Sequence, residues 1–168
     1  MLADTHDNLP LVDRAVSRLA SLSPDLVLHA GDFVSPFVIP RLAALPCPCI
    51  GVFGNNDGDR GLLAAKAKES GTVELHGSFT ARLLDGRSIA LLHGHEPDLL
   101  DEIAGEGIFD AVISGHTHRP SISRQGRTLL VNPGEACGYL TGKATVAVLE
   151  TGAMEAEILE IRKDSPEA

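Results

Sequence analysis

The chain has 168 residues, a length that suits one domain with a well-buried core and is short for two, so we expect a single domain over residues 1–168. Hydrophobic residues make up 43% and charged residues 22%, which excludes a disordered chain. The net charge of −9 argues against non-specific binding to nucleic acids or to membrane surfaces.

The first half of the chain is patterned as alternating strands and helices. Only residues 1–3 precede the polar Asp4, so either the first strand is clipped or the natural chain begins upstream. Apolar residues at helical spacing, with Pro10 in the first turn, predict a helix over 10–19. Short apolar runs bounded by Pro, Asp and Gly predict buried strands at 26–28 and 50–53, and further helices are predicted near 37–45 and 61–68.

The second half is patterned as hairpins. Asp85-Gly86 separates two apolar runs, and both residues tolerate the positive φ of a type I′ turn. Gln125-Gly126 and Thr151-Gly152 separate two further pairs of runs. A chain with strand–helix–strand units first and hairpins later fits two mixed sheets packed face to face, with helices outside.

Polar residues recur where the apolar runs end. The five segments are Asp4-Thr5-His6, Gly31-Asp32, Gly54-Asn55-Asn56-Asp57, His93-Gly94-His95 and Gly115-His116-Thr117-His118. Sites in α/β sheets form beyond the carboxyl ends of strands, so we expect these segments to meet. A lone histidine is most often structural, but only His76 of the seven histidines lies outside the strands and segments of this pattern.

The residue types in these segments predict a metal centre. Asp4 and His6 are two residues apart, as are His116 and His118, so in extended backbone each pair points to one side. Imidazole, carboxylate and amide donors without cysteine suit Mn²⁺, Fe, Zn²⁺, Co²⁺ or Ni²⁺. There are more donors than one tetrahedral ion can use, which favours two ions.

The five motifs resemble those of the calcineurin-like metallophosphoesterases, above all the small single-domain bacterial and archaeal phosphodiesterases of that superfamily. The resemblance extends from Asp4 to about Gly134 and includes the segment Val131-Asn132-Pro133-Gly134. It implies a four-layer αββα sandwich of two mixed β-sheets flanked by helices, with a dinuclear metal centre. Carried over motif by motif, it implies that Asp4, His6 and His118 hold one ion, that Asn55, His93 and His116 hold the other, and that Asp32 bridges them.

Two such ions hold a hydroxide between them at neutral pH, and the positive charge that remains attracts a phosphate. We expect the two ions to be Mn²⁺, with Ni, Fe, Co or Zn as alternatives.

Three further residues, Asn56, Asp57 and His95, are candidate catalytic residues. Many family members have a histidine where this chain has Asn56, and an amide can donate a hydrogen bond but cannot act as an acid. Asp57 is expected to orient a ligating or substrate-facing group. His95 is the candidate for a substrate-facing donor or acid, against the alternative of a hydrogen-bonded loop histidine. For His29 a supporting role at the site and a buried structural role stay equally open.

We therefore predict a metal-dependent phosphoesterase that hydrolyses small phosphodiesters. The alternative is a non-catalytic metal-binding or protein-interaction scaffold on the same fold, similar to the retromer subunit of the superfamily. We expect a small-molecule substrate and neither a membrane nor a nucleic-acid partner, and we leave a homodimer or homotetramer open. An acid at position 4, where a signal peptide would be apolar, predicts a cytoplasmic location.

Overall fold

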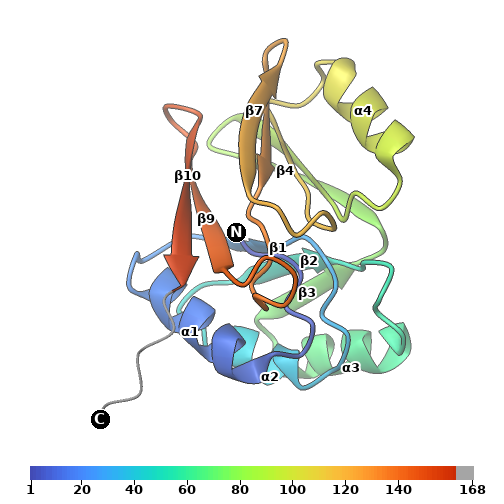
Figure 1. Ribbon diagram of the computed structural model, residues 1–168, viewed down its shortest axis with the longest axis vertical. Helices are drawn as coiled ribbons and strands as arrows, with labels where there is room; N and C mark the ends of the chain where they lie inside the picture. Colours follow the sequence, from blue (N-terminus) through green and yellow to red (C-terminus); the bar gives the residue numbers. More distant parts are fainter. Residues whose placement is uncertain (162–168) are drawn as a thin grey trace.

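Two mixed β-sheets lie face to face with helices on their outer sides in the computed structural model, which describes residues 1–161 (Figure 1). This arrangement confirms the expected αββα sandwich. In chain order the elements are α1 (Leu9–Ala20), β1 (Val27–His29), α2 (Val38–Leu42), β2 (Cys49–Val52), α3 (Arg60–Ser70), β3 (Val73–His76), β4 (Phe79–Leu84), β5 (Arg87–Leu92), α4 (Pro97–Gly105), β6 (Ala111–Ile113), β7 (Ser121–Gln125), β8 (Thr128–Asn132), β9 (Ala144–Glu150) and β10 (Glu155–Ile161).

The first sheet is assembled around the first residues of the chain. β1, β2 and β3 are parallel neighbours, and Leu2 forms a parallel bridge with His29 of β1. On the other side, the backbones of Met1 and Ala147 exchange two hydrogen bonds of 2.7 and 2.9 Å. Because Ala147 belongs to β9, which pairs with β10, the short first segment joins the β9–β10 hairpin to the parallel strands.

The second sheet has the order β4-β5-β6-β8-β7, with a parallel centre and an antiparallel strand at each edge. The β4–β5 turn has φ of 50° at Asp85 and 78° at Gly86, which confirms the type I′ prediction. The turn between β7 and β8 lies one residue later than predicted, because Gln125 already pairs with Thr128.

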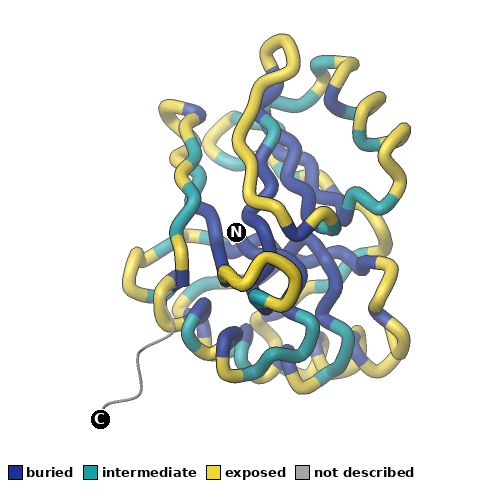
Figure 2. Tube along the Cα trace, in the orientation of Figure 1, coloured by how far each residue is buried: buried dark blue, intermediate teal, exposed yellow. Residues whose placement is uncertain are grey.

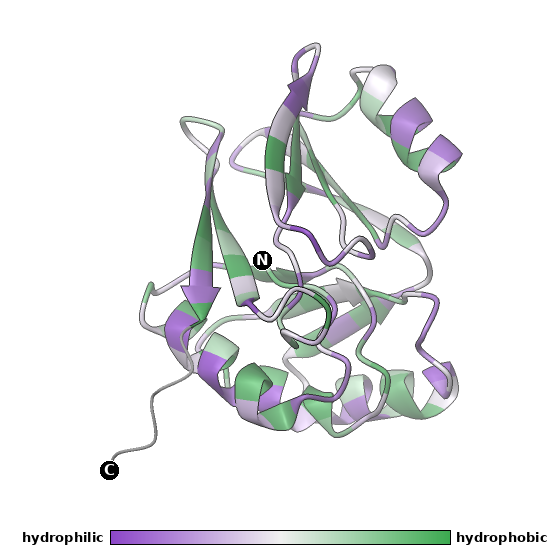
Figure 3. Cartoon of the chain, in the orientation of Figure 1, coloured by the Kyte–Doolittle hydropathy of each residue, from purple (hydrophilic) through white to green (hydrophobic). Residues whose placement is uncertain are grey.

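The buried apolar residues form three clusters, and strands β1, β2 and β6 are buried along their whole length, whereas β7 is exposed throughout (Figures 2 and 3). Leu28, Ile89 and Ile113 are buried between the two sheets. Helices α1, α2 and α3 cover the outer face of the first sheet, and α4 covers that of the second beside Leu92 and Val112. Burial on both faces suits the continuous apolar runs of the parallel strands and fixes where each run ends.

Two elements were not predicted from the sequence, β3 and α4. β3 has only four residues, of which one is buried, so its apolar pattern is weak. α4 has nine residues and buries only Ala104 completely, which leaves a faint helical pattern after Pro97. No helix in the described part of the chain is long and apolar enough to cross a membrane.

Candidate metal centre

The five polar segments meet at one edge of the sandwich, as expected. The Asp4 amide donates to the Gly31 carbonyl at 3.0 Å, and the Gly115 amide donates to the His93 carbonyl at 2.9 Å. The His116 amide donates to the Asp4 carboxylate at 3.0 Å, which ties the first segment of the chain to the last. Segments more than a hundred residues apart thus contribute to one site.

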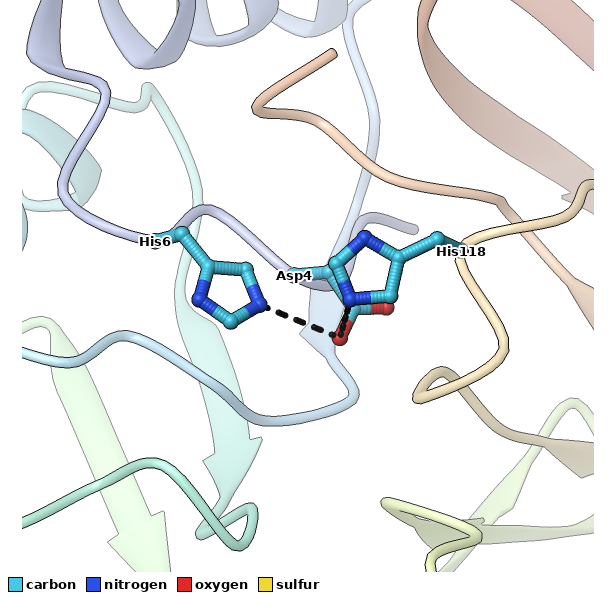
Figure 4. Close-up of side chains that lie close together, drawn as sticks. All are labelled: Asp4, His6 and His118. Atoms are coloured by element: carbon cyan, nitrogen blue, oxygen red, sulfur yellow. Dashed lines mark ion pairs between the residues drawn. The ribbon is translucent and has the colours of Figure 1, made fainter. Parts of the chain in front are cut away.

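Asp4, His6 and His118 form one group of donors (Figure 4). Asp4 Oδ1 lies 3.9 Å from His6 Nε2 and 3.7 Å from His118 Nε2. Asp4 Oδ1 and His6 Nε2 are buried and have no hydrogen-bond partner among the described residues. Buried polar atoms are nearly always satisfied, so these two orphaned atoms fit a bound cation that both would ligate.

Asp32 lies between this group and a second one. Its Oδ2 is 3.4 Å from His6 Nε2 and 3.3 Å from His93 Nε2. His93 Nε2 is also 3.0 Å from Asn55 Oδ1, and the His93 and His116 rings are 5.1 Å apart. The carboxylate that the resemblance assigns as the bridge therefore contacts one imidazole of each predicted ligand set.

The backbone at the site is not extended, contrary to the expectation for the Asp4/His6 and His116/His118 pairs. Their φ values are 50°, 40°, 68° and 60°, and Asp32 has 60°. Such left-handed conformations cost non-glycine residues about 1–3 kcal/mol each and tend to cluster at functional sites. The pairs converge because these turns redirect the chain, and not because of the alternation of a strand.

Two glycines are required by close approach to the candidate ligands. A Cβ atom at Gly54 would overlap the carboxylate of Asp32, and one at Gly115 would lie 2.9 Å from Asp4 Oδ2. Neither position therefore has room for a side chain. This explains the glycines at these two strand ends.

The charges at the site also fit a cation. Burial raises the pKa of Asp4 to about 6, an increase that the nearby His93 and His118 oppose but do not cancel. Burial acts to raise the pKa of Asp32 too, but hydrogen bonds from His93 and Asn56 outweigh it and lower that pKa. Burial lowers the pKa of His6 and of His116, which favours the neutral imidazole that a metal needs.

The three candidate catalytic residues lie beside the second group. Asn56 donates from its backbone N to Asp32 Oδ1 at 2.8 Å and from Nδ2 to Asp32 Oδ2 at 2.7 Å. The buried Asp57 accepts hydrogen bonds from the amides of Asp32, Val34 and Gly54 at 3.2, 2.7 and 2.7 Å, so it holds two loops together. The His95 ring is 5.5 Å from that of His93, and its Nδ1 is buried without a partner among residues 1–161.

His29 has the contacts of a structural histidine. It is fully buried and stacks on Phe33 with 3.8 Å between ring centroids. Its Nδ1 accepts the Gly31 amide at 3.1 Å, so Nε2 carries the proton and donates to Thr5 Oγ1 at 3.2 Å. Burial lowers the pKa of His29 to about 3, and the ring stays neutral. Of the two roles left open, the structural one fits these contacts.

Sequence reasoning missed Glu135. This side chain is 0% exposed, and its Oε2 lies 2.8 Å from His118 Nδ1. Burial acts to raise its pKa, but hydrogen bonds from His118 and Thr141 outweigh it and hold the pKa at about 2. The sequence signal for Glu135 was its position, directly after the segment that ends at Gly134 and next to the apolar Ala136 and Cys137.

Comparison with known proteins agrees with this geometry. Residues 1–154 match the calcineurin-like phosphoesterase superfamily domain. A phosphodiesterase from Methanocaldococcus jannaschii is 36% identical over 151 residues, which cover 90% of this chain and 91% of the relative. A solved archaeal phosphodiesterase superposes with a TM-score of 0.89 at 35% identity, over 95% of this chain and 96% of that one. Vps29 from Entamoeba histolytica has a TM-score of 0.69 over 96% and 97% of the chains, and its 19% identity shows a shared fold alone.

The fold and its cluster of donors thus define a metal-dependent phosphoesterase. The chain belongs to the calcineurin-like phosphoesterase superfamily, as its motifs predicted.

Proposed function

We propose that this chain is a phosphodiesterase that hydrolyses small phosphodiesters with two divalent transition-metal ions. The observation that carries the proposal is the position of Asp32 Oδ2, 3.4 Å from His6 Nε2 and 3.3 Å from His93 Nε2. An oxygen flanked in this way can serve both ligand sets. The proposed ligands are Asp4, His6 and His118 for one ion, Asn55, His93 and His116 for the other, and Asp32 for both.

The protein's own groups orient the reactants. When bound, the two ions would lower the pKa of a water held between them and draw charge from the phosphate. Asp57 fixes the backbone on which Asp32 and Gly54 lie. Asn56 holds both oxygens of Asp32 and so restrains the bridging carboxylate. His95, whose buried Nδ1 has no hydrogen-bond partner among residues 1–161, is the candidate to orient the phosphate or to protonate the leaving group.

The charge of the protein supports a small substrate. An acidic protein with a net charge of −9 repels a polyanion, whereas a local pair of metal ions still attracts one phosphate group. The M. jannaschii relative is itself named a phosphodiesterase. We further propose Mn²⁺ as the metal and the cytoplasm as the location, with a homo-oligomer as an open assembly state.

A substrate panel tests the activity. Protein stripped with a chelator is assayed on phosphodiesters and phosphomonoesters with Mn²⁺ or Ni²⁺ added. We expect diester hydrolysis that the chelator abolishes and the metal restores, with His76→Ala as a control, because His76 lies on β3 and pairs with Glu74 and Arg82.

Faster turnover of monoesters would contradict the assignment as a phosphodiesterase. Bound metal without turnover of any ester would favour the scaffold alternative instead.

A further inference from the structure

Glu135 joins a candidate metal ligand to a loop of the protein. Its buried carboxylate contacts His118 Nδ1 at 2.8 Å through Oε2. The same carboxylate accepts hydrogen bonds from five further donors in the segment that follows it. They come from Cys137 Sγ at 3.1 Å, the backbone amides of Tyr139, Leu140 and Thr141 at 3.0, 3.0 and 2.5 Å, and Thr141 Oγ1 at 2.7 Å.

We call residues 137–141 the clasp loop. The side chains of Tyr139 and Leu140 are 61% and 75% exposed, so apolar packing does not hold the tip of this loop. The hydrogen bonds to Glu135 hold it, together with one from Asn8 Nδ2 to the Cys137 carbonyl at 2.8 Å. At its base, the Cys137 amide donates to the Asp4 carbonyl at 3.1 Å. The loop is therefore attached to two of the proposed ligands.

The cluster of Glu135, Cys137 and His118 is a support and not a further metal site. One donor atom from each of the three lies within 4.8 Å of the others, which is a spacing that a metal could use. The two carboxylate oxygens, however, already accept hydrogen bonds from the ring, the thiol and the loop amides. A metal ion would have to displace several of these bonds.

We propose that Glu135 is a positioning residue that couples the metal centre to the clasp loop. This inference rests on the proposed metal site. When His118 Nδ1 donates its proton to Glu135, Nε2 is left unprotonated, and it lies 3.7 Å from Asp4 Oδ1, on the side of the proposed ion. A metal at Nε2 then fixes the ring orientation that supplies Glu135 with one of its donors.

The coupling is reciprocal by thermodynamic linkage. If the metal favours the ring orientation that holds Glu135, then the ordered loop must favour metal binding by the same factor. When the metal is absent, the His118 ring can turn or take the other tautomer. Glu135 then loses a partner inside the protein, and the loop amides lose part of their anchor.

Two variants test the coupling. Glu135→Gln keeps the size of the side chain but replaces one acceptor oxygen by an NH₂ group and removes the charge. Thr141→Val removes one hydroxyl donor to Glu135 and leaves the contact between Glu135 and His118 in place. Mn²⁺ binding is measured by calorimetry on stripped protein, and amide hydrogen exchange is measured at residues 139–141 with and without Mn²⁺.

We expect Mn²⁺ to slow amide exchange at residues 139–141 in the wild type. Glu135→Gln should weaken the binding of one of two ions by about 10–100-fold, the usual effect of removing a partner of a metal-bound histidine. It should also speed exchange at residues 139–141 with and without metal. Thr141→Val should speed amide exchange in the same loop. It should also weaken the binding of the same ion, by a smaller factor than Glu135→Gln.

Wild-type Mn²⁺ affinity in both variants, or loop exchange that does not respond to Mn²⁺ in the wild type, would overturn the coupling and leave the proposed function intact. A wild-type protein that binds no divalent ion would overturn the proposed function and the coupling with it. If Glu135→Gln does not fold, as circular dichroism would reveal, Thr141→Val decides the question alone.

Discussion

Asp32→Asn should reduce phosphodiester hydrolysis below detection. We expect this loss to be larger than the loss caused by substituting any of the candidate catalytic residues. Asp32 is asked to hold both ions, and its Oδ2 already lies within 3.5 Å of His6 Nε2 and His93 Nε2 at 3.4 and 3.3 Å. Asparagine has nearly the same volume but no charge, so the substitution removes the bridging anion while leaving the packing intact. The loss affects the nucleophile and the charge stabilisation of the phosphate together.

The matched comparison is His95→Ala. His95 is proposed only to contact the phosphate or to transfer a proton, and proton transfer contributes about 10²–10⁴-fold to the rate. Both variants are measured as kcat/KM on an activated aryl phosphodiester, with metal content determined for each. Equal losses, or an Asp32→Asn protein that retains two ions and most of its activity, would show that the ligand set is wrongly assigned.

The wild type should cleave aryl phosphodiesters with good leaving groups far faster than alkyl ones. Asn56 occupies the position where many family members have a histidine, and its amide cannot give up a proton. A missing general acid costs about 10²–10⁴-fold when the leaving group is a poor one. The measurement is a series of aryl esters of rising leaving-group pKa, for which we expect a steep fall in rate.

Asn56→His should flatten this dependence. The Asn56 side chain already points to the centre of the site, with Nδ2 2.7 Å from Asp32 Oδ2. An imidazole there can act as an acid if it comes within about 2.6–3.2 Å of the leaving oxygen. Asn56→Ala is the control, and its rate should still fall steeply as the pKa of the leaving group rises. A flat wild-type series with chemistry rate-limiting would show that another residue, such as His95, supplies the proton.

The sequence predicted the meeting of the strand ends because all five ends have ligand-type side chains and four of the five combine them with a glycine. It predicted the wrong local geometry for Asp4 and His6, because the strand ends before them and left-handed turns follow. Those turns depend on long-range hydrogen bonds such as that from the His116 amide to Asp4. Pattern reasoning within a short window does not include such contacts.

Glu135 and His29 show that sequence spacing does not reveal how a side chain packs. Glu135 lies 17 residues after its partner His118, and nothing in the spacing shows that its carboxylate is buried against that ring. His29 ends a predicted strand like several of the proposed ligands, and only its stacking on Phe33 and its bond to Thr5 reveal a structural role. Residue type and position predicted which segments come together, whereas packing distinguishes the structural His29 from the candidate ligands.

The most direct test of a dinuclear centre is anomalous diffraction from crystals of this protein grown with excess Mn²⁺. We predict two anomalous peaks about 3.5–4 Å apart, the spacing of two-metal hydrolases, with the Asp32 carboxylate in contact with both. One peak should lie against Asp4, His6 and His118, and the other against Asn55, His93 and His116. A single peak under saturating Mn²⁺, or two peaks of which Asp32 contacts only one, would contradict the account.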